Sequence, residues 1–318
     1  MFAKVLLIMN NMQTPILLIT FNRPAHTKKV VEAILASKPQ DLFVFQDGAR
    51  QGNSSDIEKC AEVRQVVETL TKDKGVCLHT LYSDKNLGCG PGPATGITWF
   101  FDNVEQGIII EDDCILGPSG FTFYENMLKR FKDDERISAI TATNLLLKWR
   151  SRHVPYLFST VGAGTLGCWA SWARAWKKFD YYITAWHTEE GKETLKKHFG
   201  NKSYYKYYET IFEKCDNKQT HMWDYQWFFS KMINGTFTVV SSLNQVSNIG
   251  FDAEGTHTVS PSRLANFPLY DIPTSLKQLP VKRDILYDWD VFQRYYNPKK
   301  KTLLMRLTLK VIDFLFRH

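Results

Sequence analysis

The sequence predicts an α/β protein with a mainly parallel β-sheet. Short apolar runs alternate with longer segments of helical periodicity through the N-terminal part of the 318-residue chain. Each apolar run ends in a polar turn, as expected where a buried strand reaches the edge of a sheet. The hydrophobic content of 44% is sufficient for a sizeable core, and the charged content of 23% is ordinary for a globular protein.

The expected elements alternate along this part of the chain. Strands are predicted from short apolar runs at residues 15–21, 42–45, 77–82 and 107–110. Helices with an apolar stripe are predicted between them at residues 25–36, 57–70 and 97–101. Such strands pair in parallel through right-handed crossovers, and ligands bind beyond their carboxyl ends. The polar residues at these ends should therefore converge on one crevice: Asn22-Arg23, Asp47-Gly48, Asp84 and Glu111-Asp112-Asp113.

Composition divides the chain into five parts. Aromatic residues become dense after about residue 150, where helices are expected to alternate with loops before a final strand at 237–241. Prolines recur later in the chain and favour an extended conformation. The expected parts are an irregular arm without an export signal (1–14), a first half (15–150), a second half of the same domain (151–260), an extended trailing segment (261–298) and a terminal helix (299–318).

The net charge of +7 is concentrated at the C-terminus. Residues 299–318 carry six basic side chains and one acid, which is +5, so the other residues carry only +2. A nucleic-acid binder more often spreads basic side chains over a folded face, and no nucleic-acid partner is expected. The six cysteines form no Cys-x-x-Cys pair, which argues against a structural zinc site and a disulfide scaffold. Reduced thiols of a cytoplasmic enzyme are the simpler interpretation.

The strongest chemical signal is the acidic triplet Glu111-Asp112-Asp113, which follows an apolar strand. Adjacent carboxylates repel one another, so their grouping is favourable where a cation is shared. Oxygen ligands without clustered cysteine or histidine select Mg²⁺ or Mn²⁺, which in turn hold a diphosphate. The alternative is a solvated acidic turn in which an aspartate caps a helix.

Several motifs together resemble glycosyltransferases of the GT-A class. Residues 18–24 are similar to the opening strand and turn of family 2 glycosyltransferases. Residues 45–48 and 111–113 resemble the inverting N-acetylglucosaminyltransferases of the N-glycan pathway. Residues 86–88 match the loop that often precedes the third helix in these enzymes, and residues 167–172 resemble an aromatic segment of bacterial relatives. The resemblance covers roughly residues 15–260 and implies the GT-A fold, with a nucleotide-sugar-binding first half and an acceptor-binding second half.

The resemblance implies roles for matching positions in the first half. Asp47 would meet the base or ribose, although Asp47-Gly48 is also an ordinary turn sequence. Glu111 and Asp112 would contact ribose, diphosphate or donor sugar, and Asp113 would bind Mn²⁺ or Mg²⁺. The remaining donor-binding residues would be Thr20, Asn22, Arg23, Asn86 and Gly88. The forked guanidinium of Arg23 suits a phosphate group.

The catalytic base and the acceptor site are expected in the second half. Inverting transfer requires a carboxylate that takes the acceptor proton, and Asp224, between Trp223 and Tyr225, is the candidate. Asp216 and Asp252 are weaker candidates. Alternatively, Trp223 and Trp227 form a core stripe and Asp224 caps a helix. The tryptophans 169, 172 and 176 fall at helical spacing, and Trp169 is expected to face a sugar. His257, in a late polar turn, is expected to contact metal or phosphate.

The terminal segment 299–318 is predicted to be a basic amphipathic helix. Lys299, Arg306, Lys310, Asp313 and Arg317 cluster within about 60° of a helical wheel, and apolar residues fill the rest. This pattern suits a helix that lies on an anionic membrane surface. The alternative is a helix that docks on the body of the protein or on another subunit.

Together these observations predict a metal-dependent inverting glycosyltransferase at the inner face of the membrane. The expected donor is a nucleotide sugar, with UDP-sugar favoured, and the acceptor a glycan or a lipid-linked sugar in surface polysaccharide synthesis. A sugar-nucleotide nucleotidyltransferase is the main alternative, but it requires a basic glycine-rich loop where this chain has Asn22-Arg23-Pro24. A non-catalytic nucleotide- or sugar-binding protein is the other alternative, and loss of the acidic triplet would favour it.

Overall fold

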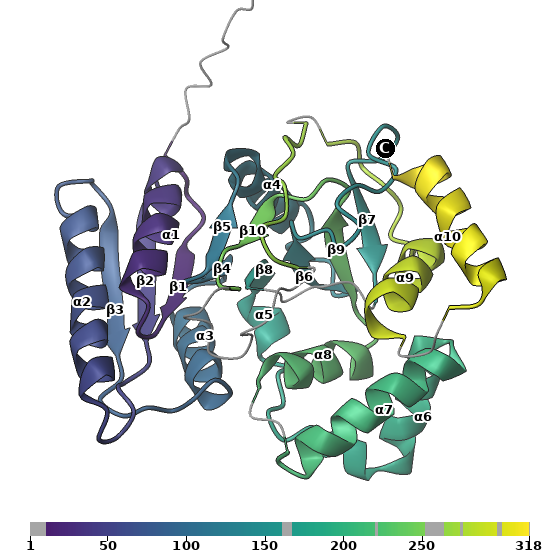
Figure 1. Cartoon of the computed structure of the whole chain (residues 1–318), viewed down its shortest axis with the longest axis horizontal. Coiled ribbons are helices and arrows are strands. Elements are labelled where there is room, and N and C mark those ends of the chain that lie inside the picture. Colours follow the sequence, from purple (N-terminus) through teal and green to yellow (C-terminus); the bar gives the residue numbers. More distant parts are fainter. Residues whose placement is uncertain are drawn as a thin grey trace, which may run out of the picture.

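The structure, a computed structural model, describes residues 11–160, 167–219, 222–251, 264–273, 276–297 and 301–317. Its strands are β1 (Ile16–Thr20), β2 (Asp41–Gln46), β3 (Cys77–Tyr82), β4 (Gln106–Glu111), β5 (Cys114–Leu116), β6 (Ile137–Thr141), β7 (Tyr156–Ser159), β8 (Cys168–Trp172), β9 (Phe237–Ser241) and β10 (Val246–Asn248). Its helices are α1 (Pro24–Ala36), α2 (Ser54–Thr71), α3 (Pro91–Asn103), α4 (Pro118–Arg130), α5 (Ala173–Trp176), η1 (Thr184–His187), α6 (Glu189–Phe199), α7 (Lys202–Asp216), α8 (Asp224–Ile233), α9 (Ile285–Val291), η2 (Phe292–Tyr296) and α10 (Leu303–Phe316). Figure 1 shows their arrangement.

A mixed sheet forms the centre of the described chain, with the strand order β3-β2-β1-β4-β8-β6-β9-β7. Strand β1 is parallel to β2 and β4, β2 to β3, and β6 to β9, whereas β8 and β7 run antiparallel to their neighbours. The prediction of an α/β fold with a mainly parallel sheet is confirmed. The chain proceeds from β1 through β2 to β3 and then returns to place β4 on the other side of β1. This reversal makes a crevice between the carboxyl ends of β1 and β4.

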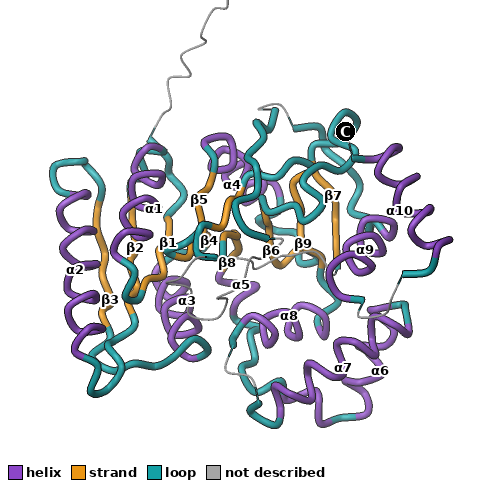
Figure 2. The backbone as a smooth tube through the Cα atoms, in the orientation of Figure 1, coloured by secondary structure: helices purple, strands orange, loops and turns teal. Residues whose placement is uncertain are grey.

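Helices cover both faces of the sheet because alternate strand residues point to opposite faces. Ile16 and Leu18 of β1 pack with apolar residues of α1, α2 and α4. Leu17 and Ile19 face the other way and pack with residues of α3, α5 and α8. Figure 2 shows α6 and α7 stacked below α8, away from the sheet. Their aromatic side chains form a further buried cluster with α8 and η2.

Three predictions of local structure after residue 130 are corrected. Strands β7 and β8 join the central sheet in the region after residue 150, where helices alternating with loops were expected, and β6 joins it from a region for which no element was predicted. Trp169 and Trp172 lie on strand β8 and point to opposite faces, so their helical spacing was misleading. Both faces of β8 are buried, which hides the alternation that identifies a strand. Within the expected extended segment 261–298, Asp284 accepts a hydrogen bond from the Tyr287 backbone (3.0 Å) and begins α9, which η2 continues.

Candidate functional site

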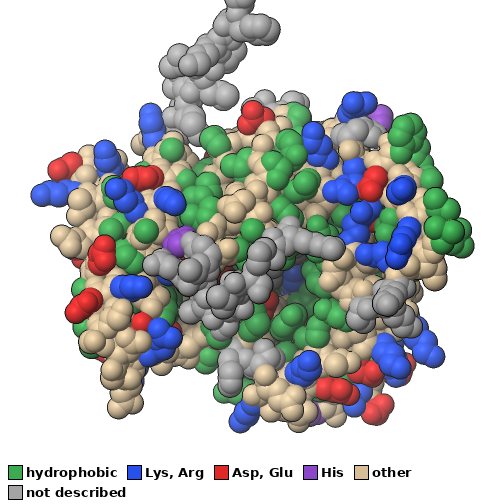
Figure 3. Space-filling view, in the orientation of Figure 1, with side chains coloured by type: hydrophobic (Ala, Val, Ile, Leu, Met, Phe, Trp, Pro, Cys, Tyr) green, Lys and Arg blue, Asp and Glu red, His purple; other side chains and the backbone are tan. Residues whose placement is uncertain are grey.

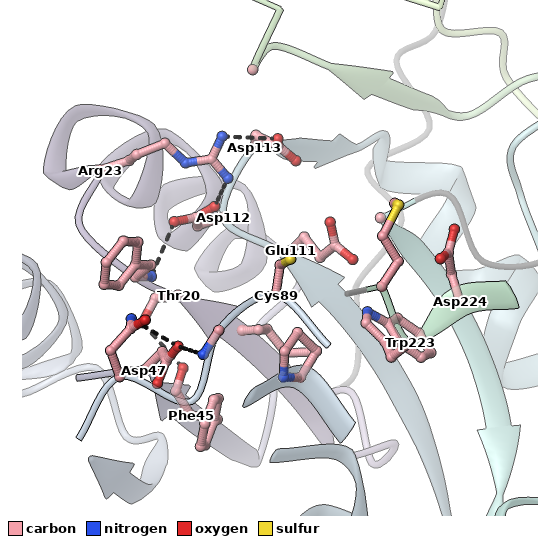
Figure 4. Close-up of a pocket in the computed structure, with 18 of the residues that line it drawn as sticks. Thr20, Arg23, Phe45, Asp47, Cys89, Glu111, Asp112, Asp113, Trp223 and Asp224 are labelled. Carbon is pink, nitrogen blue, oxygen red and sulfur yellow. Dashed lines mark hydrogen bonds and ion pairs between the residues drawn. The ribbon is translucent and has the colours of Figure 1, made fainter. Parts of the chain in front are cut away.

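A cavity of about 420 Å³ opens at the carboxyl ends of β1, β2 and β4. This volume is in the range of small-molecule sites. Its polar and charged lining residues are Thr20, Arg23, Asp47, Arg50, Asn86, Glu111, Asp112, Asp113, Asp224 and Asn248. Figure 4 shows how several of these side chains point into the cavity. The predicted convergence of the polar residues that follow the strands is confirmed for all of them except Asn22, Gly48 and Asp84, which do not line it.

Arg23 connects the turn after β1 to the acidic triplet after β4. Its guanidinium donates to the carboxylate of Asp112 and, over 3.1 Å, to that of Asp113. The Asp112 carboxylate also accepts a hydrogen bond from the backbone N–H of Phe21 (3.4 Å). Burial acts to lower the pKa of Arg23, but the two carboxylates outweigh it and raise this pKa. Arg23 therefore stays charged and neutralises part of the acidic triplet.

Glu111 lies between the ion pairs of Arg23 and the second half of the chain. Its carboxylate points away from Arg23 toward the side of the cavity that holds Trp223 and Asp224 (Figure 4). Burial, followed by repulsion from Asp113 and Asp112, raises the pKa of Glu111 to about 8. A carboxyl group with this pKa exchanges a proton near neutral pH.

The segment after β10 holds Asp113 in place. The amide of Asn248 donates to the Asp113 carboxylate (3.2 Å), and the backbone N–H of Ile249 donates to the Asp113 carbonyl (2.8 Å). Gly250 lies so close that a Cβ atom there would be 2.3 Å from Asp113 Oδ2. This packing brings residues 135 positions apart into one corner of the cavity. His257, predicted as a metal or phosphate contact, lies outside the described residues.

Asp47 organises the loop that follows β3. Its carboxylate accepts hydrogen bonds from the backbone N–H groups of Leu87 (2.7 Å) and Gly88 (2.9 Å) and from the Asn86 amide (3.1 Å). Burial raises the pKa of Asp47, and these backbone donors oppose the shift. Gly88 has a φ of +83°, a conformation that glycine adopts without strain. The predicted donor residues Asp47, Asn86 and Gly88 therefore form one connected wall of the cavity.

Asp224 lies at the first position of α8 and lines the cavity from the second half. Its carboxylate accepts a hydrogen bond from the Tyr225 backbone N–H (3.0 Å), and burial raises its pKa. Trp223 and Trp227 are both buried in the core, as the stripe interpretation expected. Trp223 also lines the cavity beside Asp224. The two tryptophans can therefore belong to the core while Asp224 belongs to the site.

Two predicted site residues lie elsewhere in the structure. Asn22 donates to Asp56 (2.8 Å) and holds the start of α2 instead of lining the cavity. Trp169 is fully buried, and its ring packs against those of Trp223 (5.9 Å) and Trp227 (5.8 Å). The prediction that Trp169 faces a sugar is therefore wrong in this structure, because β8 turns this side chain into the core.

Several lining residues were missed by the sequence analysis, and Arg50 is the most important of them. Its guanidinium pairs with Asp56 (2.5 Å) and lies 5.7 Å from the centre of the Phe21 ring. It adds a second cation to a cavity for which only Arg23 was expected to supply one. No motif identified it, because Arg50 follows Asp47-Gly48 in a turn whose residue types are common. Met222 was missed in the same way.

The chemistry of the acidic triplet fits a divalent cation. Its carboxylate oxygens are the ligands that Mg²⁺ and Mn²⁺ prefer. Asn248 turns its amide nitrogen to Asp113 (3.2 Å), and its amide oxygen accepts from the Gly250 backbone N–H (2.8 Å). Among the described residues, only Asp41, Cys77 and His79 have three potential ligand atoms within 4.8 Å of one another. That group lies at the other end of the sheet, where His79 hydrogen-bonds Asp41 (2.9 Å). A Mg²⁺-type ion is commonly held by one or two carboxylates together with substrate phosphates, so a preformed cage is not required.

Comparisons with known proteins reveal only distant similarity. No protein-family model and no curated protein matches the chain. Among solved structures, the inositol-1-phosphate CTP transferase from T. maritima is 12% identical, with 53% of this chain and 74% of that chain covered and a TM-score of 0.30. An apo UDP-glucose pyrophosphorylase is 9% identical, with 74% and 93% covered and a TM-score of 0.36. A putative glucose-1-phosphate thymidylyltransferase from Bacillus anthracis is 10% identical, with 54% and 74% covered and a TM-score of 0.30. These are similarities of α/β architecture and assign no activity.

Proposed function

We propose that this protein is a glycosyltransferase that moves a sugar from a nucleoside-diphosphate donor to an acceptor hydroxyl with inversion at the anomeric carbon. One observation carries the proposal. A partly buried carboxylate, Asp224, lines the same cavity as the Arg23–Asp112–Asp113 cluster and comes from the other half of the chain. The cluster would bind the diphosphate of the donor, and Asp224 would accept the proton of the acceptor hydroxyl. Because the two lie on opposite sides of the cavity (Figure 4), the arrangement suits in-line displacement of the diphosphate by the acceptor.

In this reaction the acceptor oxygen forms a bond to the anomeric carbon while the bond to the diphosphate oxygen breaks. Asp224 takes the proton of the acceptor hydroxyl, and the nucleoside diphosphate leaves with the bonding electrons. The raised pKa of Asp224 makes it a stronger base than an exposed aspartate. Arg23 and Arg50 offer guanidinium groups to the leaving diphosphate. Trp223, which lines the same cavity, would help to exclude water from this side of the site.

We further propose that Asp113 binds Mn²⁺ or Mg²⁺, with Asp112 and Glu111 beside it. The bound ion would supply positive charge to the leaving diphosphate. Arg23 already pairs with Asp113, so the ion would share this carboxylate with the guanidinium. The wall formed by Asp47, Asn86 and Gly88 would bind the nucleoside, and a UDP-sugar is the donor that we favour.

A sugar-nucleotide nucleotidyltransferase is the second candidate, because the similar solved structures carry names of that class. Such an enzyme binds a nucleoside triphosphate and releases pyrophosphate. The turn after β1, with Arg23 as its basic residue and Pro24 beginning α1, offers few backbone donors for a triphosphate. Nucleotidyl transfer to a sugar phosphate requires no proton acceptor, because the attacking phosphate oxygen is already anionic, so Asp224 would have no role as a base in that reaction. These two features favour the glycosyltransferase.

The test is a screen of nucleotide sugars with Mn²⁺ in which released nucleoside diphosphate and pyrophosphate are both measured. Release of nucleoside diphosphate is expected, and release of pyrophosphate from a triphosphate and a sugar phosphate would favour the second candidate instead. Asp224→Asn should lower kcat by about a hundredfold or more with nucleotide affinity kept. Asp216→Asn is the matched control, because Asp216 pairs with His187 (3.1 Å) outside the cavity lining. Equal loss in both variants would refute the assignment of the base.

A further inference from the structure

Helix α10 is held against the body of the protein by one face. Leu309 and Ile312 are buried. Ile312 packs in the hydrophobic cluster that contains Trp149, which lies between β6 and β7. Asp313 accepts from Arg294 (2.8 Å) and from Arg317 (3.0 Å), and Arg317 also donates to the Leu146 carbonyl (3.0 Å). These contacts fix which side of α10 faces outward. The contacts of the alternative interpretation, a terminal helix docked on the body, are therefore present on this face.

The outward face of α10 is apolar. Leu303, Leu304, Leu307, Val311, Phe314 and Leu315 are exposed, and Phe314 is 84% exposed. With about 100° per residue, the six side chains occupy a sector of about 120°, opposite or beside the body-facing residues. They make up more than half of the exposed large hydrophobic side chains in the described chain. A contiguous apolar stripe of this kind marks an interaction surface on a protein of this size.

Two exposed cations border the stripe on one side. Arg306 and Lys310 fall within about 60° of its edge on the helical wheel, and both are exposed. Figure 3 shows hydrophobic side chains along the edge of the molecule where α10 lies, with Lys and Arg side chains gathered beside them. Of the other charged residues predicted for this border, Asp313 and Arg317 are turned to the body, and Lys299 lies outside the described residues.

We infer that α10 docks the protein on an anionic bilayer surface, with the leucine stripe in the acyl–headgroup boundary and Arg306 and Lys310 at the lipid phosphates. A single convex helix with an apolar stripe and a cationic border has the geometry of an interfacial helix. A second copy of this chain fits less well, because the only carboxylate of α10, Asp313, is already paired and leaves none for Arg306 and Lys310. No helix of the described residues is long and apolar enough to cross a membrane. The inference does not depend on the proposed function.

The test is co-sedimentation of the full chain with vesicles of phosphatidylcholine containing about one-third phosphatidylglycerol. The wild type should bind these vesicles and bind vesicles of pure phosphatidylcholine much less. The combined variant Leu303→Ser, Leu307→Ser, Phe314→Ser should lose about tenfold or more of the binding. Arg306→Gln with Lys310→Gln should weaken binding and reduce its dependence on salt.

The matched control removes exposed hydrophobic side chains elsewhere, with Ile57→Ser, Tyr182→Ser and Leu269→Ser, and should bind like the wild type. Because the substituted side chains of both sets are exposed, the circular dichroism spectrum should stay unchanged. Absence of wild-type binding to anionic vesicles would overturn the inference, as would equal binding by the stripe variant. Sedimentation velocity without lipid tests the alternative of a second copy of the chain. A wild-type dimer, a monomeric stripe variant and no vesicle binding would together overturn the inference.

Discussion

The guanidinium of Arg23, which precedes α1, is paired with the carboxylate of Asp112, which follows β4. Both side chains are largely buried, with 14% and 4% of their surface exposed, and the same guanidinium reaches Asp113. The pair therefore joins the carboxyl ends of the two adjacent strands that flank the crevice. It also makes a protein cation compete with any metal ion for the same carboxylates, which has consequences that can be measured.

Replacement of Arg23 by Met should destabilise the protein and strengthen its response to Mn²⁺. Removal of one partner leaves buried carboxylates unpaired, which costs about 3 kcal/mol. The vacated site is more negative, so Mn²⁺ should raise the Tm of Arg23→Met more than that of the wild type. Differential scanning calorimetry with and without Mn²⁺ measures both effects. Arg50→Met is the control, because Arg50 pairs with Asp56 and not with the triplet. An identical Mn²⁺ response in all three proteins would argue against metal binding at Asp113.

A methyl group at position 250 should disable the site by steric displacement. In Gly250→Ala the new Cβ would lie 2.3 Å from Asp113 Oδ2, so the Asp113 carboxylate has to move. Misplacement of a site residue by about 1 Å can cost a hundredfold in rate, and overpacking costs about 1–3 kcal/mol in stability. Turnover of the nucleotide sugar should therefore fall by about a hundredfold, whereas the denaturation midpoint should shift only modestly. Unchanged turnover would show that the position of Asp113 does not matter for the reaction.

The N-terminal half of the fold was predictable because its signals are local. Strands β1, β2 and β4 are apolar runs that end in polar turns, and the helices between them carry regular stripes. Helix α3 began earlier than expected, since Pro91 lies in its first turn, a position that proline tolerates. The position of the triplet at the end of β4 followed from this order alone.

The second half was less predictable because its determinants are non-local. Strand β8 is inserted between β4 and β6 and is buried on both faces, so its sequence carries no alternation. The contact of Asn248 and Gly250 with Asp113 depends on the pairing of β10 with β5, which no short motif encodes. Arg50 could be found only after the turn beyond β2 was placed over the cavity. Asp224 was an exception, because the aromatic run around it, typical of a sugar-binding segment, pointed to it, and it lines the cavity.

Trp169 provides a test of the corrected assignment to the core. The side chain is fully buried against Trp176 (6.3 Å), Trp223 and Trp227. Trp169→Leu should lower the free energy of unfolding by about 3 kcal/mol because it leaves a cavity. Nucleotide affinity, measured by titration calorimetry below the unfolding transition, should stay close to that of the wild type. Loss of donor binding without loss of stability would restore the original prediction that Trp169 contacts the sugar.

Lys231 of α8 gives the protein a stability that depends on pH. Its ammonium group is buried, 3.2 Å from Thr238 Oγ1, and burial lowers its pKa to about 7. The unfolded chain keeps the ordinary pKa near 10.4. Between these two values the unfolded state binds one more proton than the folded state, so this group makes stability rise with pH. Below about pH 7 both states are protonated and the contribution is constant.

Replacement of Lys231 by Met should remove this pH dependence. Between pH 7 and pH 9 the wild type should gain about 2 kcal/mol relative to Lys231→Met, from the linkage of about 1.4 kcal/mol per pH unit. At pH 7 and below the variant should be the more stable protein, since Met fills a similar volume without the cost of burying a charge. Urea denaturation at several pH values measures the difference. Lys214, in the last turn of α7, is the control, and Lys214→Met should leave the slope unchanged. A pH-independent difference between wild type and Lys231→Met would mean that Lys231 titrates alike in the folded and unfolded states.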